Sequence, residues 1–160
     1  IDKEKKEVKF LGNKFDGKVI YTGEIDVLFD NIYGDLPYRS LRFVYENYQK
    51  EYFQETAMTS YPNNYDFTRT TETKHMTGQD SKTTTVIYEY PQKYERNVPG
   101  KDVPYYPIPN KENRERYEKY KKHAEDYKNL ILIGRLARYL YYNMDQMIKL
   151  TLDTFEEKIK

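Results

Sequence analysis

The stretch 134–146 carries the residue types best suited to binding an anionic or heteroaromatic ligand. It follows a short apolar run and contains Arg135 together with three tyrosines. Asn143 is a good helix N-cap and Gln146 stands three residues later, so a capping box should open a helix at Met144. Because a helix N-terminus attracts anions, this strand-to-helix junction is a candidate binding site. Alternatively, the tyrosines are half-buried packing residues and Arg135 is a surface ion-pair partner.

A second candidate is Arg69, in a segment whose β-branched and aromatic residues are typical of a strand. From a sheet face, its planar guanidinium could grip a phosphate with two parallel hydrogen bonds. The alternative is a cross-strand salt bridge with Glu72 or Glu89. The sequence alone leaves both interpretations open.

Two further segments could contact a phosphate or a cofactor. Tyr106 follows another tyrosine and precedes Pro107, so a stiff loop presents phenols that could donate to a phosphate oxygen. Simple packing is the alternative for these phenols. Thr22 and Gly23 end a predicted strand, where glycine permits close backbone approach to a cofactor edge, as it does in any turn.

The composition excludes several other kinds of chemistry. There is no cysteine and there are two histidines, so disulfides and a catalytic thiol are excluded and no metal centre is expected. Lysine and arginine total 27 against 26 acidic residues, so no net field favours nucleic acid or an anionic membrane. No membrane-span-length apolar run, general acid/base pair, or glycine-rich dinucleotide or phosphate loop occurs. We expect a cytoplasmic protein whose 19 tyrosines indicate a missing neighbour.

The pattern predicts an α+β fold, with an antiparallel sheet of about five to six strands and C-terminal helices, as a single domain over 1–160. A hairpin of 8–11 and 18–22 is expected near the start of the chain. Residues 18–109 should form mainly antiparallel sheet and loops. Four further strands, expected to form a meander, are 41–46, 55–60, 67–74 and 83–90. A proline-rich, irregular connection follows at 91–109.

Residues 110–160 should form a helix, a strand and a second helix. Asn110 can cap the first helix, which is expected to run to about Lys128 with its tyrosines on the face of Ala124. The strand covers 130–133. In the last helix an apolar stripe at helical spacing is expected to lie in the core. Its members are Ile148, Leu152, Phe155 and Ile159.

In their order and separation, several segments resemble the C-terminal part of UDP-galactopyranose mutase. The resemblance covers roughly residues 18–155. The matching blocks are 18–26 with 29–30, 36–43, 67–69 with Glu72 and 74–75, 89–91, 104–107 and 134–146. Several blocks in the correct order are far more specific than any one of them.

The resemblance implies the C-terminal domain of a flavin-dependent isomerase that interconverts UDP-galactopyranose and UDP-galactofuranose for cell-wall or polysaccharide biosynthesis. In that family reduced FAD is the nucleophile toward the anomeric carbon, so no residue of this chain is expected to be catalytic. The absence of an acid/base pair agrees with chemistry that belongs mainly to a cofactor. The parent enzyme is expected to be a homodimer that takes UDP-galactose as its substrate.

The resemblance also assigns two groups of site residues. The residues expected to bind the substrate diphosphate are Arg69, Tyr106 and Tyr141. The residues expected to contact the flavin are Arg135, Tyr142, Asn143, Met144, Thr22 and Gly23. The chain departs from the family pattern at Asn143, where the family has an aspartate, and at Asp145, where it has a histidine. The parent could therefore be a divergent mutase acting on a related nucleotide sugar.

The family's nucleotide-binding portion is missing from these residues, so the chain resembles a fragment of a larger flavoprotein. The segment 110–160 would pack on the missing N-terminal FAD domain. We expect this chain alone to bind no FAD and to show no mutase activity. Two other interpretations stay open: a non-catalytic nucleotide-sugar binding module, and a structural or oligomerisation domain whose tyrosines serve an interface.

Overall fold

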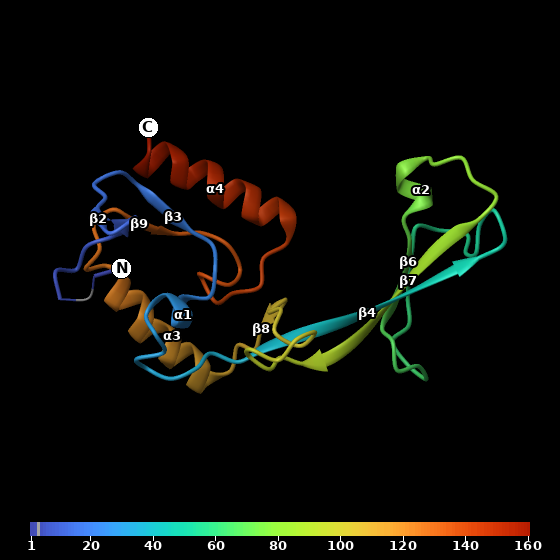
Figure 1. The fold of residues 1–160 in the computed structure, drawn as a ribbon, viewed down its shortest axis with the longest axis horizontal. Coiled ribbons are helices and arrows are strands. Elements are labelled where there is room, and N and C mark those ends of the chain that lie inside the picture. Colours follow the sequence, from blue (N-terminus) through green and yellow to red (C-terminus); the bar gives the residue numbers. More distant parts are fainter. Residues whose placement is uncertain (3) are drawn as a thin grey trace. The chain divides into compact units, whose positions relative to one another are not determined.

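The computed structural model describes residues 1–2 and 4–160, which form two compact units (Figure 1). We call Ile1–Tyr38 with Tyr106–Lys160 the terminal unit, and Arg39–Tyr105 the sheet unit. The terminal unit contains β1 (Lys9–Phe10), β2 (Asn13–Lys14), β3 (Val19–Tyr21), α1 (Ile25–Leu28), β8 (Tyr106–Pro107), α3 (Lys111–Ala124), β9 (Leu130–Leu132) and α4 (Met144–Lys158). The sheet unit contains β4 (Tyr38–Tyr48) without its first residue, and β5 (Met58–Ser60), β6 (Arg69–Glu72), α2 (Lys74–Thr77) and β7 (Thr84–Lys93).

A parallel pair of strands, β3 and β9, is the centre of the terminal unit (Figure 1). Val19 pairs with Leu130, Ile20 with Ile131 and Tyr21 with Leu132. The predicted hairpin of 8–11 with 18–22 is therefore wrong, because β1 pairs with β2 and β3 pairs with β9. Near-continuous apolar runs are typical of parallel strands, but the partner lies far away in the chain, beyond the reach of local turn chemistry.

Both long helices begin where the sequence predicted. The Asn110 side chain accepts a hydrogen bond from the Asn113 backbone N–H at 2.8 Å and caps α3. At the start of α4 the capping box forms, with the Asn143 backbone N–H donating to Gln146 Oε1 at 2.9 Å. α3 ends at Ala124, earlier than predicted, because the following residues close turns that lead into β9.

Aromatic rings fill the core of the terminal unit. Phe29 is fully buried, with its ring centroid 4.8 Å from that of His123 and 5.5 Å from that of Tyr127. The ring of Tyr120 is also buried, and its hydroxyl donates to the Gly34 carbonyl at 2.9 Å. Tyr120 and Tyr127 therefore face the core as predicted, and the Tyr120 hydroxyl finds a backbone partner inside it.

The apolar stripe of α4 does not lie in a core within this chain. Ile148 and Leu152 are 62% and 61% exposed, and the remaining two members, Phe155 and Ile159, are exposed as well. Thr154 is the buried residue of α4. The prediction of a buried stripe is therefore wrong, because periodicity identifies an apolar helix face but not the surface that covers it. None of the helices formed by the described residues is long and apolar enough to cross a membrane.

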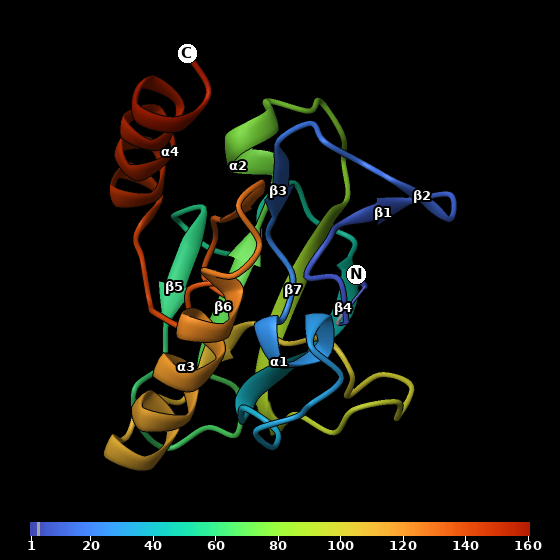
Figure 2. The same ribbon diagram turned by 90° about the vertical axis from the view of Figure 1, so that its left-hand side faces the viewer.

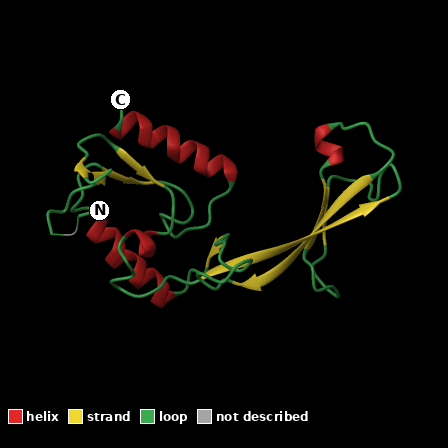
Figure 3. Ribbon diagram, in the orientation of Figure 1, coloured by secondary structure: helices red, strands yellow, loops and turns green. Residues whose placement is uncertain are grey.

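The sheet unit contains a twisted antiparallel sheet, whose two longest strands appear in Figure 3 as a strongly twisted ribbon. The complete strand order is β5-β6-β7-β4-β8, so the predicted α+β class with a five-stranded antiparallel sheet and a C-terminal helix is confirmed. β5, β6 and β7 form a meander as predicted, but β4 pairs with β7 and not with β5. The long β4 and β7 can form many more ladder hydrogen bonds with each other than β4 could with the three-residue β5.

α2 stands where the end of a strand was predicted at 67–74. It ends at Gly78, whose φ of 65° is left-handed, and Figures 1 and 2 show it at one end of β6 and β7. Lys74, at its start, is buried, and its ammonium donates to the carbonyls of Glu51, at 2.7 Å, and Ser81. The ammonium also lies 4.7 Å from the ring centroid of Tyr52. Through Lys74, α2 therefore holds the loops that contain Glu51 and Ser81 in place.

Candidate functional site

The carboxyl ends of β3 and β9 bring together two predicted cofactor segments. The Ile133 backbone N–H donates to the Tyr21 carbonyl at 3.0 Å, which extends the parallel pairing past the strands. Gly134 has a φ of 101°, and a Cβ there would lie 3.4 Å from the Thr22 carbonyl oxygen. The contact distance is ordinary, and it is the φ that favours glycine. Thr22 therefore lies against the backbone that leads directly into Arg135.

Arg135 lies beside two predicted diphosphate-binding tyrosines, whose rings also contact each other. Its guanidinium carbon is 4.8 Å from the ring centroid of Tyr141 and 5.8 Å from that of Tyr106. The two rings are 5.8 Å apart and inclined by 30°. We call these three residues the tyrosine–arginine cluster. Such stacking fixes a guanidinium by cation–π attraction and leaves its N–H edge directed away from the ring faces.

The structure tests one of the two interpretations of Arg135, the surface ion pair. Within the part of the chain that the structure describes, no carboxylate forms an ion pair with Arg135, so the surface ion pair considered from the sequence does not form. The sequence assigned Arg135 to the cofactor and the two tyrosines to the diphosphate, and the structure places all three side by side. Sequence reasoning missed this cation–π arrangement, because nothing in their spacing indicates that 106 and 141 meet.

The remaining predicted cofactor residues form the start of α4. The guanidinium carbon of Arg138 lies 5.9 Å from the ring centroid of Tyr142. Asn143 caps the helix, and the Met144 side chain is 80% exposed. These residues therefore present a helix N-terminus with its partial positive charge, next in sequence to the cluster.

Arg69 lies in the sheet unit, on β6, and is bonded to Glu89. The Arg69 Nε donates to one carboxylate oxygen at 2.8 Å and Nη2 donates to the other at 2.7 Å, while Nη1 points to the Met58 sulfur at 3.4 Å. The cross-strand salt bridge that the sequence offered as an alternative is thus present. Glu72, the other acidic candidate, accepts hydrogen bonds from different residues. The diphosphate role of Arg69 stays a prediction, with Glu89 fixing the orientation of its guanidinium.

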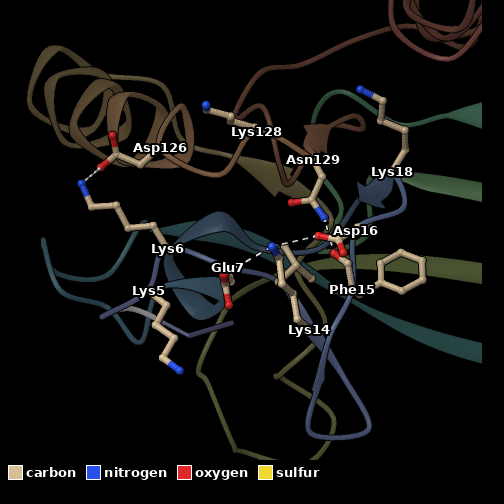
Figure 4. A pocket seen from close by; sticks show the side chains of 11 residues that line it. Lys5, Lys6, Glu7, Lys14, Phe15, Asp16, Lys18, Asp126, Lys128 and Asn129 are labelled. Carbon is tan, nitrogen blue, oxygen red and sulfur yellow. Dashed lines mark hydrogen bonds and ion pairs between the residues drawn. The ribbon is translucent and has the colours of Figure 1, made fainter.

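One hollow on the surface of the terminal unit contains none of the predicted site residues (Figure 4). It holds about 480 Å³ beside β2 and the end of the α3–β9 connection. Lys6 pairs there with Asp126 at 2.7 Å, and Lys14 pairs with Asp16 at 3.1 Å. Lys5, Lys18 and Lys128 also line it, but Figure 4 shows their ammonium groups pointing in different directions. Its size alone does not identify a site.

Comparisons with known proteins agree with the sequence resemblance. A family model described as UDP-galactopyranose mutase matches residues 2–141. A UDP-galactopyranose mutase from Mycoplasma genitalium is 38% identical over 145 residues, which is 89% of this chain and 36% of that protein. The Mycoplasma pneumoniae protein of the same name is 32% identical over 96% of this chain and 39% of its own length. A dTDP-fucopyranose mutase from Escherichia coli is also 32% identical, over 90% of this chain and 38% of its own length.

The family match extends over most of the chain, from the β1–β2 region to Tyr141 in the cluster. The chain belongs to the UDP-galactopyranose mutase family. It spans less than two fifths of the length of these curated relatives.

Proposed function

We propose that this chain is the C-terminal part of a flavin-dependent isomerase that interconverts UDP-galactopyranose and UDP-galactofuranose. The observation that carries the proposal is the tyrosine–arginine cluster, which follows the carboxyl ends of a parallel strand pair. Ligands of open α/β sheets bind outside the carboxyl ends of such strands. Family membership and the mutase names of the relatives support the same conclusion.

The residues at this edge fit a flavin. Gly134 has a φ of 101°, which favours glycine, and it lies against Thr22, so the strand ends present backbone without a bulky side chain at 134. Asn143 opens α4, whose N-terminus can stabilise negative charge on a bound ring or phosphate. Thr22, Gly23 and Arg135 would hold the cofactor from the strand ends, with Tyr142, Asn143 and Met144 on the helix side. When bound, the reduced flavin supplies the nucleophile toward the anomeric carbon.

The chain's own part in the reaction is to bind and stabilise the diphosphate. Tyr106 and Tyr141 are half-buried or exposed phenols that could donate to phosphate oxygens. Arg69 would add a guanidinium held by Glu89. Negative charge grows on UDP as it leaves the sugar, so fixed donors aimed at the diphosphate lower the barrier to its departure. We also propose, on the family resemblance, that the whole protein is a cytoplasmic homodimer, which sedimentation would test.

A related nucleotide sugar is a second candidate substrate. A relative named for dTDP-fucopyranose matches this chain as well as one of the relatives named for UDP-galactopyranose does. Asn143 also provides a neutral cap at the start of α4. Binding titrations with UDP and dTDP side by side separate the two substrates.

Substituting Arg69 tests the diphosphate role. In the longer protein that contains this chain, Arg69→Ala should weaken UDP binding roughly tenfold or more, because a charge-assisted hydrogen bond is lost. Calorimetric titration with UDP gives the Kd. Arg42→Ala is the matched control: Arg42 lies on β4 over the ring of Tyr90, at 4.1 Å, and its neighbour Phe43 shares the face of Glu89 and Arg69. Arg42 therefore points to the opposite face. Equal UDP affinity in wild type and Arg69→Ala would contradict the proposal.

A further inference from the structure

Tyr139 joins three segments of the terminal unit through one buried hydroxyl. Its single proton faces the carbonyl oxygens of Pro37, at 2.6 Å, and Ile108, at 3.1 Å. The same oxygen lies 3.3 Å from the Ile108 backbone N–H, which donates to it. Burial raises the pKa of Tyr139 to about 12, so the phenol keeps its proton at physiological pH and remains a donor.

The backbone at Tyr139 is held in an uncommon conformation. Its φ is 45°, in the left-handed region that a bulky residue adopts only when its surroundings enforce it. The surroundings are rings: Tyr38 stands edge-on at 5.4 Å and Tyr117 is stacked at 6.1 Å. The turn is closed by the Leu140 N–H, which donates to the Arg135 carbonyl at 3.2 Å. A non-glycine outlier of this kind is a reason to look for a functional constraint.

That constraint lies at the tyrosine–arginine cluster. Ile108 is two residues from Tyr106, and Tyr139 is two residues from Tyr141. The Tyr139 hydroxyl therefore fastens the two segments close to the rings that stand 5.8 Å apart around Arg135. Asn113 Nδ2 also donates to the Ile108 carbonyl, at 2.7 Å, whereas the Tyr139 hydroxyl contacts both the Pro37 and the Ile108 backbone.

We propose that Tyr139 is a positioning residue that sets the spacing of Tyr106 and Tyr141 for the substrate diphosphate. The inference rests on the proposed function. Tyr139 itself does not touch the ligand; it acts through the two segments that it joins. Loss of its hydroxyl should therefore weaken diphosphate binding while the ring still fills its place in the core.

The test uses Tyr139→Phe in the longer protein, with UDP as the probe. The Kd should rise roughly tenfold, as expected for one lost hydrogen bond that orders a site. In turnover with UDP-galactofuranose and reduced FAD, kcat/KM should fall by at least the same factor, because misplaced phenols also stabilise less of the negative charge that grows on the departing UDP. Tyr117→Phe is the matched control, since its ring stacks on Tyr139 and its burial raises its pKa to about 12 as well. Its Kd should equal that of the wild type.

Each outcome decides the inference. Equal weakening by Tyr139→Phe and Tyr117→Phe would show a general packing effect and overturn it. An unchanged Kd in Tyr139→Phe, with binding lost in Arg69→Ala, would overturn it and leave the proposed function intact. Unchanged binding in both Tyr139→Phe and Arg69→Ala would instead overturn the proposed function. If Tyr139→Phe does not fold, 4-aminophenylalanine at position 139 supplies a weaker donor in the same place. The Kd of that variant for UDP should exceed the wild-type Kd. Equal Kd values would overturn the inference.

Discussion

At the scale of single residues, Glu72 holds the loop that follows β4. Its carboxylate is fully buried and accepts hydrogen bonds from the backbone N–H groups of Phe53 and Gln54, both at 3.0 Å, and from the Thr84 hydroxyl. His75 Nε2 lies 3.3 Å away. Burial by itself would raise the pKa of Glu72, but the hydrogen bonds from Thr84, Gln54 and Phe53, aided by His75, outweigh burial and lower it.

The lowered pKa of Glu72 predicts an acid-sensitive fold. A carboxyl group whose pKa is lower in the folded state stabilises that state above its ordinary pKa of 4.5, and the contribution is lost as the pH falls through the lowered value. Glu72→Gln should therefore be less stable at neutral pH and should lose less stability on acidification. Thermal unfolding of the chain from about pH 7 to about pH 3 measures both effects.

A matched control separates Glu72 from the other carboxylates. Glu55→Gln changes an exposed carboxylate near the same loop and should leave the pH dependence as in the wild type. Parallel pH profiles for wild type and Glu72→Gln would contradict the account of Glu72.

The sequence alone could have excluded Glu72 as the salt-bridge partner of Arg69. Residues 69 and 72 are three apart, and side chains alternate along a strand, so they point to opposite faces of β6. Glu89 stands directly opposite Arg69 in the β6–β7 register, which puts both on one face. The register itself depends on how β7 pairs with two neighbours, and single-sequence patterns do not determine it.

Among the elements, α4 shows that sequence periodicity identifies an apolar helix face but not the surface that covers it. The capping box at Asn143 and Gln146 involves residues three apart, so the sequence located the start of the helix correctly. The apolar stripe was also identified, but its exposure shows that no surface within the described residues covers it. Exposed apolar residues in a continuous row are typical of an interaction surface. We propose that an FAD domain, which the family resemblance leads us to expect in the longer protein, covers this face of α4.

Leu152→Asn tests that proposal by comparing two lengths of the same protein. In the 160-residue chain Leu152 is 61% exposed, so its replacement should change the free energy of unfolding by less than about 0.5 kcal/mol. In the longer protein the same substitution should cost about 2 kcal/mol or more, because a covered leucine would be lost. Urea unfolding of both lengths gives the two values.

The control for this comparison is Glu157→Gln, an exposed polar position on α4 that should have a small effect in both lengths. An equally small effect of Leu152→Asn in the longer protein would show that α4 keeps this face open, and the proposed covering of α4 would be wrong.

At the scale of the whole molecule, the described residues form two compact units, and the site residues are divided between them. Local signals predicted both helix starts and most strands. The β3–β9 pair was missed because parallel partners are joined by contacts between distant parts of the chain. Likewise, the resemblance supplied Arg135, Tyr106 and Tyr141 as site residues, but their cation–π arrangement depends on the folding of segments far apart in sequence. Whether 1–160 acts as a single domain stays a prediction.

We propose that this chain supplies diphosphate and flavin contacts to a mutase that needs more than these 160 residues. The most direct test is turnover of UDP-galactofuranose to UDP-galactopyranose with dithionite-reduced FAD, followed by chromatography of the products. We predict turnover by the longer protein, strong loss of turnover in its Arg69→Ala variant, and none by the 160-residue chain. Turnover by the 160-residue chain alone, or an Arg69→Ala enzyme as active as the wild type, would contradict it.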